Sequence, residues 1–143
     1  MKHFLLVLFL MLIGCNKTEV EGITVNRAFV ESQSHADNVK LMTLVEQTLD
    51  HNEKALADLI EFPCGGASYC YDLGSVIAQI VYTMGEDDFA EMIASLNKIQ
   101  QRDLLNLIEV GLEYGFQLDP KAKNQIIQNQ FPTLYNQLQA DNP

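Results

Sequence analysis

The chain has 143 residues, with 19 acidic and 9 basic side chains and a formal net charge of −10 at pH 7. This length is enough for one domain and not comfortably enough for two. The acidic balance argues against a nucleic-acid partner, because proteins that bind nucleic acid cluster Lys and Arg, and against a polybasic contact with anionic lipid. It favours a soluble, self-repelling surface and is compatible with a basic protein partner.

Residues 1–14 have the pattern of a secretory signal peptide. Lys2 and His3 precede ten consecutive apolar residues, 4–13, and Gly14 and a polar stretch follow. A positive start, a short apolar core and a small-residue exit are typical of export signals, and the apolar run is shorter than the roughly 20 residues that span a bilayer. A buried N-terminal helix is the alternative, but a run that is apolar on every face suits export better.

The signal ends in Leu12-Ile13-Gly14-Cys15, which resembles the lipobox of bacterial lipoproteins, with a bulkier isoleucine where that motif usually has alanine or serine. The resemblance covers about the first 17 residues. It implies cleavage before Cys15 and acyl chains on that residue, and two or more such chains hold a protein firmly on a membrane. Asn16, in place of the aspartate that retains enteric lipoproteins at the inner membrane, implies the outer membrane and a domain that faces the periplasm.

These features divide the chain into a signal peptide (1–14), a lipidated N-terminus and tether (15–34), and a helical domain (35–143). After cleavage 129 residues remain, with eight basic against 19 acidic side chains, a net charge of −11. The tether is polar with scattered apolar residues, so its later part could dock on the domain. Residues 20–25 could form a strand, but the sequence offers that strand no partner.

Beyond the tether the apolar residues recur at helical spacing. Helices are expected over residues 39–49 and, after an Asn52 N-cap, over 53–60. The clearest amphipathic stripe covers residues 73–84, where Asp72 would be the N-cap and Gly85 the stop.

Three further helical stretches follow toward the C-terminus. Asp87 or Asp88 would cap a helix that ends near residue 96, and a long helix is expected over about 99–114. Asp119-Pro120 would open a last stretch that Pro132 interrupts.

The predicted fold class is therefore all-α, with six or seven short amphipathic helices in antiparallel hairpins, arranged as a compact bundle or a short helical-repeat stack. The heptads LADLIEF (56–62) and LLNLIEV (104–110) resemble each other. This resemblance is compatible with stacked helix pairs, although helical patterning alone also produces such similarity.

Cys64 and Cys70 enclose five residues, two of them glycine. Export exposes them to an oxidising compartment, where thiols pair, and lipidation of Cys15 would leave them as the one remaining pair. A loop of this size can bring the two Cα atoms to disulfide distance. A zinc site would need two further ligands at a more usual spacing, and a reactive thiol with His51 as its base rests on one cysteine and one distant histidine.

No pattern of residues predicts catalytic chemistry, a metal site or a cofactor. Ser75 follows Gly74 but lacks the G-x-S-x-G pattern, and Gly65-Gly66 precedes no P-loop lysine. The acidic run Glu86-Asp87-Asp88 lacks the alternating spacing of a calcium loop and is explained more simply by favourable charge at a helix N-terminus.

The candidate partner-binding residues are Tyr69 and Tyr71, on a loop that a disulfide would stiffen, and the acidic run Glu86, Asp87 and Asp88. A Tyr114-Gly115-Phe116 turn is a weaker candidate, and core packing is the alternative for the aromatic residues. The sequence thus favours a non-enzymatic, membrane-anchored lipoprotein of the periplasm whose acidic helical domain binds a protein. An immunity protein that neutralises a secreted toxin and an enzyme of the cell envelope are the alternatives.

Overall fold

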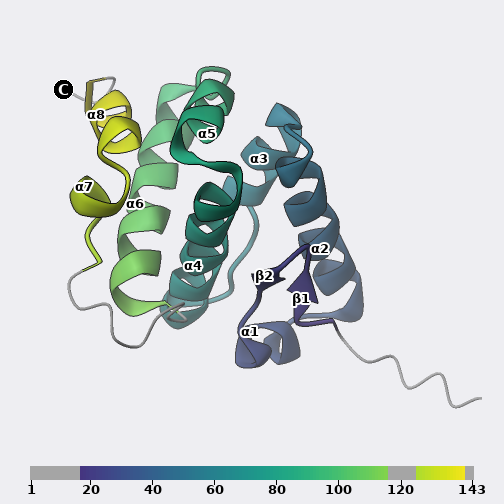
Figure 1. Ribbon diagram of the computed structural model, residues 1–143. Coiled ribbons are helices and arrows are strands. Elements are labelled where there is room, and N and C mark those ends of the chain that lie inside the picture. The colour runs from purple at the N-terminus through teal and green to yellow at the C-terminus, as the bar shows by residue number, and fades with distance from the viewer. Residues whose placement is uncertain (1–16, 116–124, 141–143) are drawn as a thin grey trace, which may run out of the picture.

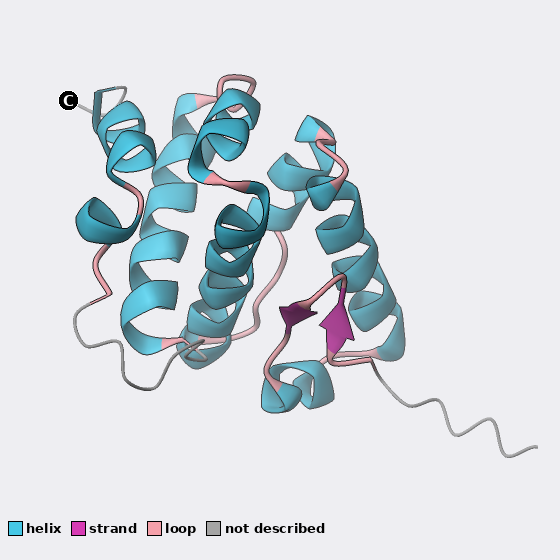
Figure 2. Ribbon diagram, viewed as in Figure 1, coloured by secondary structure: helices cyan, strands magenta, loops and turns pink. Residues whose placement is uncertain are grey.

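The computed structural model describes residues 17–115 and 125–140, which form eight helices and one two-stranded hairpin (Figure 1). The predicted all-α class is confirmed, and Figure 2 shows how small the strand contribution is. None of the helices in these two ranges combines the length and the apolar character needed to cross a membrane. Cys15, Phe116 and the predicted helix start at Asp119-Pro120 lie outside the described residues.

In chain order the elements are β1 (Glu19–Val20), β2 (Ile23–Thr24), α1 (Arg27–Ser32), α2 (His35–Leu49), α3 (Glu53–Ile60), α4 (Ala67–Met84), α5 (Glu86–Ile93), α6 (Lys98–Tyr114), α7 (Ile127–Gln130) and α8 (Pro132–Ala140). Helix α4 lies between α2 and α6, and α8 lies on the far side of α6 (Figure 1). Helix α5 contacts α4 and α8.

The expected lone strand at residues 20–25 is a hairpin, because its partner lies within the same segment. Strands β1 and β2 pair antiparallel, with Val20 opposite Ile23 and Glu19 opposite Thr24. The two turn residues, Glu21 and Gly22, have φ of 51° and 81°. Positive φ at both central positions is what a tight type I′ hairpin turn requires.

Most of the expected tether belongs to the folded domain. Ile23, Val25, Phe29 and Val30 are all buried in the same hydrophobic core as the later helices. Asn26 caps α1, since its side chain accepts a hydrogen bond from the backbone N–H of Ala28. Burial of these four large apolar side chains contributes about 1.5–3 kcal/mol each when burial is complete, which favours folding of the segment onto the domain.

Helix α4 is the centre of the fold. Ten consecutive residues, 72–81, are buried, so the helix is covered on all faces and not only along its amphipathic stripe. Small residues line the side toward α6. A Cβ atom on Gly74 would overlap the carbonyl oxygen of Leu107, and one on Gly111 would overlap the backbone of Gly74. The two backbones therefore approach each other closely at Gly74 and Gly111.

The helix ends confirm some predictions and correct others. Asn52 caps α3 through a hydrogen bond from the Ala55 N–H, and Gly85 ends α4, both as predicted. Asp72 is not the cap of α4, which begins five residues earlier, after Gly66. Instead Asp72 lies within α4, and its buried carboxylate accepts a hydrogen bond of 3.0 Å from the Asn26 side-chain amide. This bond connects α4 to the start of α1.

Neither Asp87 nor Asp88 is the cap of α5. That helix begins at Glu86, directly after Gly85, and the two aspartates lie in its first turn. Gly85 ends α4 and directly precedes the first residue of α5. Its φ of 93°, which glycine adopts without strain, turns the chain between the two helices. The carboxylates remain favourable there through the helix dipole.

Gln79 joins the hairpin to the central helix. Its side-chain carbonyl accepts a hydrogen bond from the Thr24 N–H, and its side-chain amide donates one to the Thr24 C=O, both at 2.8 Å. The buried Gln79 amide thereby pairs both backbone groups of Thr24 on the outer edge of β2, as a neighbouring strand would. This pairing satisfies backbone groups that the small hairpin cannot satisfy by itself.

Candidate functional site

The N-terminal end of α4 carries the predicted disulfide. Cys64 and Cys70 are bonded to each other with a Cα–Cα distance of 5.0 Å. The loop between them is shorter than predicted, because α4 begins at Ala67 and places Cys70 within its first turn. The bond therefore links the incoming chain to the helix itself, and neither sulfur is the thiolate that a zinc site or a nucleophile needs.

Tyr69 is a structural contact. Its ring stacks on Phe29 with centroids 5.8 Å apart, and the Phe29 side chain is fully buried. Tyr69 is itself half-buried and packs against the core. It therefore holds α1 against α4 and presents little free surface to a partner.

The half-buried Tyr71 pairs with the exposed Tyr114 from the end of α6. The ring centroids are 5.4 Å apart, and 60% of the Tyr114 surface is exposed. The two residues meet because the α6 backbone at Gly115 comes so close to the Tyr71 carbonyl that a Cβ there would lie 2.5 Å from its oxygen. Tyr71 and Tyr114 are called the aromatic edge below.

The aromatic edge has an acidic neighbour. A hydrogen bond to the Glu113 side chain and the charge of that carboxylate raise the pKa of the Tyr114 phenol above its ordinary value. The phenol therefore stays protonated at neutral pH and keeps an O–H group. A partner at this edge would meet two aromatic rings and a carboxylate.

The acidic run at the start of α5 divides into two parts. Glu86 acts within the fold, because its carboxylate accepts a hydrogen bond of 2.8 Å from the Leu134 N–H in the first turn of α8. Asp87 is exposed. The Asp88 carboxylate lies 3.9 Å from the His51 ring nitrogen, and both side chains are more than half exposed, so this contact contributes little to stability.

The structure does not bring the predicted tyrosines and the predicted carboxylates together. They occupy opposite ends of α4, whose 18 residues span about 27 Å at 1.5 Å per residue. One protein interface can cover this distance, but one small pocket cannot.

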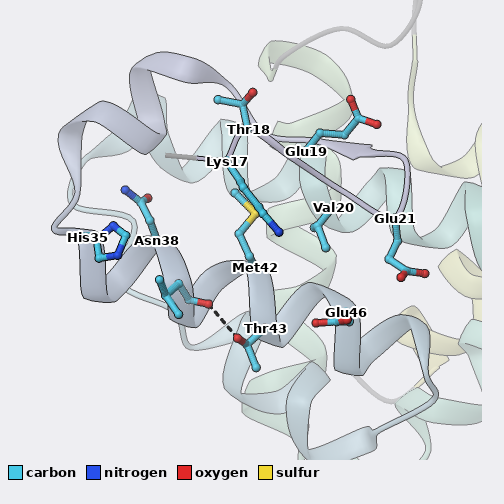
Figure 3. A pocket seen from close by; sticks show the side chains of 11 residues that line it. Lys17, Thr18, Glu19, Val20, Glu21, His35, Asn38, Met42, Thr43 and Glu46 are labelled. Carbon is cyan, nitrogen blue, oxygen red and sulfur yellow. Dashed lines mark hydrogen bonds between the residues drawn. The ribbon is translucent and has the colours of Figure 1, made fainter. Parts of the chain in front are cut away.

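A groove between β1 and α2 was not anticipated. It has a volume of about 810 Å³ and is open to solvent along one side (Figure 3). Its lining comes from residues 17–21 on the hairpin side and from one face of α2. The lining residues are Lys17, Thr18, Glu19, Val20, Glu21, His35, Asn38, Val39, Met42, Thr43 and Glu46.

Sequence reasoning missed this β1–α2 groove because it treated one of its walls as tether. The available signal was the alternation of Ile23, Thr24 and Val25, as in a strand, after the turn residues Glu21-Gly22. The other wall is a stripe of α2 positions at intervals of three and four residues, from His35 to Glu46. On that stripe Val39 keeps 52% of its surface exposed.

Metal-site chemistry finds no support in the described ranges, where no group of three His, Cys, Asp or Glu side chains lies close enough together to hold a metal ion. Comparison with protein-family models, with curated proteins and with solved structures found no match. The candidate surfaces are therefore judged on their geometry and charge alone.

Proposed function

We propose that this chain is a non-enzymatic lipoprotein, anchored in the bacterial outer membrane and facing the periplasm, whose acidic helical domain binds a protein partner. The observation that carries the binding proposal is the aromatic edge. The exposed Tyr114 ring packs on the half-buried Tyr71 ring beside a disulfide, on two helices whose backbones are in close contact. Rigid, exposed aromatic side chains are favourable binding anchors because little entropy is lost when they are buried.

Charge supports a basic partner. The chain has a net charge of −10, and the described acidic side chains around the fold are mostly exposed. Such a field speeds the approach of a positively charged partner and slows that of nucleic acid or anionic lipid. We assign the affinity to the aromatic edge and the faster association to the acidic surface, which includes Asp87 and Asp88.

The anchor proposal rests on the lipobox residues. If Cys15 carries the acyl chains, Asn16 alone separates it from Lys17, where the described domain begins. One or two residues span at most about 7 Å, so the domain would be held near the membrane surface and not at the end of a long tether. The hairpin would be the part of the described domain closest to the anchor in the sequence.

Cys15→Ser is expected to abolish lipidation and to leave an unprocessed precursor. The thiol of Cys15 is the group that takes the first acyl chain in the lipoproteins that the motif resembles, and serine lacks it. Incorporation of labelled palmitate, read on a gel beside wild type, tests this. Equal labelling of the two proteins would refute the anchor, and Cys64→Ser serves as the control that removes a cysteine elsewhere.

Tyr114→Ala is expected to weaken partner capture by at least about 30-fold, as for a hot-spot aromatic residue worth roughly 2 kcal/mol. The measurement is a pull-down from the native envelope, read by mass spectrometry and followed by a titration with the captured protein. Ile99→Ala is the matched control, because Ile99 is 63% exposed and lies at the opposite end of the same helix. Wild-type capture by both variants would place the interface elsewhere.

The identity of the captured protein decides between the alternatives of this proposal. A toxin secreted by a competitor would make the chain an immunity protein, whereas a resident envelope protein would make it an assembly or scaffold component. Capture of no protein by the wild-type chain, under conditions that retain known envelope complexes, would overturn partner binding.

A further inference from the structure

We propose that the β1–α2 groove binds an extended, basic segment of a protein, which adds as a strand to the free edge of β1. This inference deepens the proposed function, since it assumes a protein partner, and it concerns a surface distinct from the aromatic edge. Two features of the groove carry it: an unpaired strand edge, and an acidic rim over an apolar floor.

The strand edge follows from the hairpin register. In an antiparallel pair, hydrogen-bonded and non-hydrogen-bonded residue pairs alternate. Val25 donates to the Thr18 carbonyl, and both backbone groups of Thr24 are used by Gln79, so Glu19 and Thr24 form a non-hydrogen-bonded pair. The N–H and C=O of Glu19 therefore point away from β2, and neither has a partner among the described residues.

This free edge lies on the side of the groove. Glu19 is itself among the residues that line the groove, and β1 contacts α2 whereas β2 contacts α4 (Figure 1). The α2 wall runs from His35 to Glu46, about 16 Å at 1.5 Å per residue. An extended segment of about five residues covers that length. Exposed sheet edges beside a groove recur as binding sites for such segments.

The groove holds a polar group that lacks a donor. Asn38 is 3% exposed, and its side-chain amide donates a hydrogen bond of 2.8 Å to the Val30 carbonyl. Its carbonyl oxygen, Oδ1, accepts no hydrogen bond within the described part of the chain. A buried acceptor without a donor is unfavourable, but this oxygen is closed to solvent, so it weakens the α2 wall and is not a contact for a bound segment.

The charge and polarity of the groove lining favour a basic, partly apolar segment. Glu19, Glu21 and Glu46 place three carboxylates on the groove against one lysine, Lys17 (Figure 3). The floor is apolar, from Val20, Val39 and Met42. A segment that alternates basic and apolar side chains would place the first against the carboxylates and the second against the floor. An anionic lipid headgroup or an acidic peptide would be repelled.

The test uses the full chain, purified in a non-ionic detergent, and a fluorescent eight-residue peptide of alternating lysine and valine. Binding is followed by anisotropy at low salt. Expected is saturable binding that weakens as salt is added. A peptide with glutamate in place of lysine should not bind, nor should one methylated at alternate backbone nitrogens, because it cannot donate to the edge of β1.

The matched variants separate the groove from the general acidity of the surface. Glu21→Gln with Glu46→Gln removes two groove carboxylates and is expected to weaken binding about tenfold. Glu53→Gln with Glu91→Gln removes two exposed carboxylates on α3 and α5 and should leave affinity unchanged. Equal loss in the two double variants, or full binding of the methylated peptide, would overturn the inference.

The same protein preparations test two other occupants of the groove. Self-association that the Glu21→Gln, Glu46→Gln variant changes would assign the groove to a second copy of the chain. Binding to vesicles of anionic phospholipid would assign it to lipid. Either result would overturn the basic-segment proposal while leaving partner capture through Tyr114 as a separate question, so the two proposals can fail independently.

Discussion

Gly111→Ala is expected to destabilise the fold by about 3 kcal/mol or more, a large part of the 5–15 kcal/mol of a typical domain. An added Cβ at this position would overlap the backbone of Gly74 and Ser75 on the central helix α4. Backbone cannot yield as a flexible side chain can, so α4 and α6 would have to separate. Denaturant unfolding followed by far-ultraviolet circular dichroism measures the effect.

Gly66→Ala is the matched control for this variant. A Cβ at Gly66 would meet only the Tyr69 ring at 3.9 Å, an ordinary contact, and the φ there is extended. The expected cost is less than about 1 kcal/mol, from the weaker N-cap. If Gly111→Ala unfolds at the same denaturant concentration as Gly66→Ala, the close approach of α4 and α6 is wrong.

A second glycine contact between α4 and the end of α6 bears on the proposed function. Gly115 brings the end of α6 onto the Tyr71 carbonyl, and this places Tyr114 on Tyr71. Separation of the two helices would therefore disperse the aromatic edge. Gly111→Ala should weaken partner capture even where the protein remains folded.

Gln79→Leu is expected to cost about 2–4 kcal/mol, because it removes the partners of the Thr24 N–H and C=O, and each buried group left unsatisfied costs roughly 1–3 kcal/mol. Gln79 is 3% exposed, so water does not readily replace it. Gln79→Glu is expected to cost at least as much, because it would bury a carboxylate and set one of its oxygens against the Thr24 C=O, where the amide now donates. Denaturant unfolding ranks the variants.

Hydrogen exchange at the Thr24 amide supplies a local readout for this prediction. The amide should be protected in wild type and unprotected in Gln79→Leu. Gln47→Leu, at an exposed position of α2, is the control for the same substitution without a buried contact. Unchanged stability of Gln79→Leu, with the Thr24 amide still protected, would show that the side chain does not serve the strand edge.

Gln79 illustrates why the groove could not be predicted. Within α4 it is one polar residue on an amphipathic helix, and its spacing indicates no particular role. Its partner lies 55 positions earlier, in a segment that looks like a tether. Only when α4 satisfies one edge of the hairpin does the other edge become the wall of a groove.

The tyrosines make the same point for the candidate site. The local pattern of cysteines, glycines and aromatic residues predicted a disulfide-stiffened loop; the disulfide is present, but Tyr69 and Tyr71 lie in α4 and not on a loop. The pattern could not show that the Tyr69 ring would stack on Phe29. It also could not show that the Glu86 carboxylate would accept a hydrogen bond from the backbone at the start of α8. Those roles depend on elements that are distant in the chain.

The sequence by itself determined the helical class, the Asn52 and Gly85 helix ends and the pairing of Cys64 with Cys70. These follow from local spacing, capping chemistry and the redox environment that an export signal implies. The tertiary structure alone decided that residues 19–32 fold onto the core, that glycines bring α4 and α6 into backbone contact, and which polar groups remain unpaired. Those outcomes depend on packing and hydrogen bonding between residues far apart in the sequence, which no local pattern specifies.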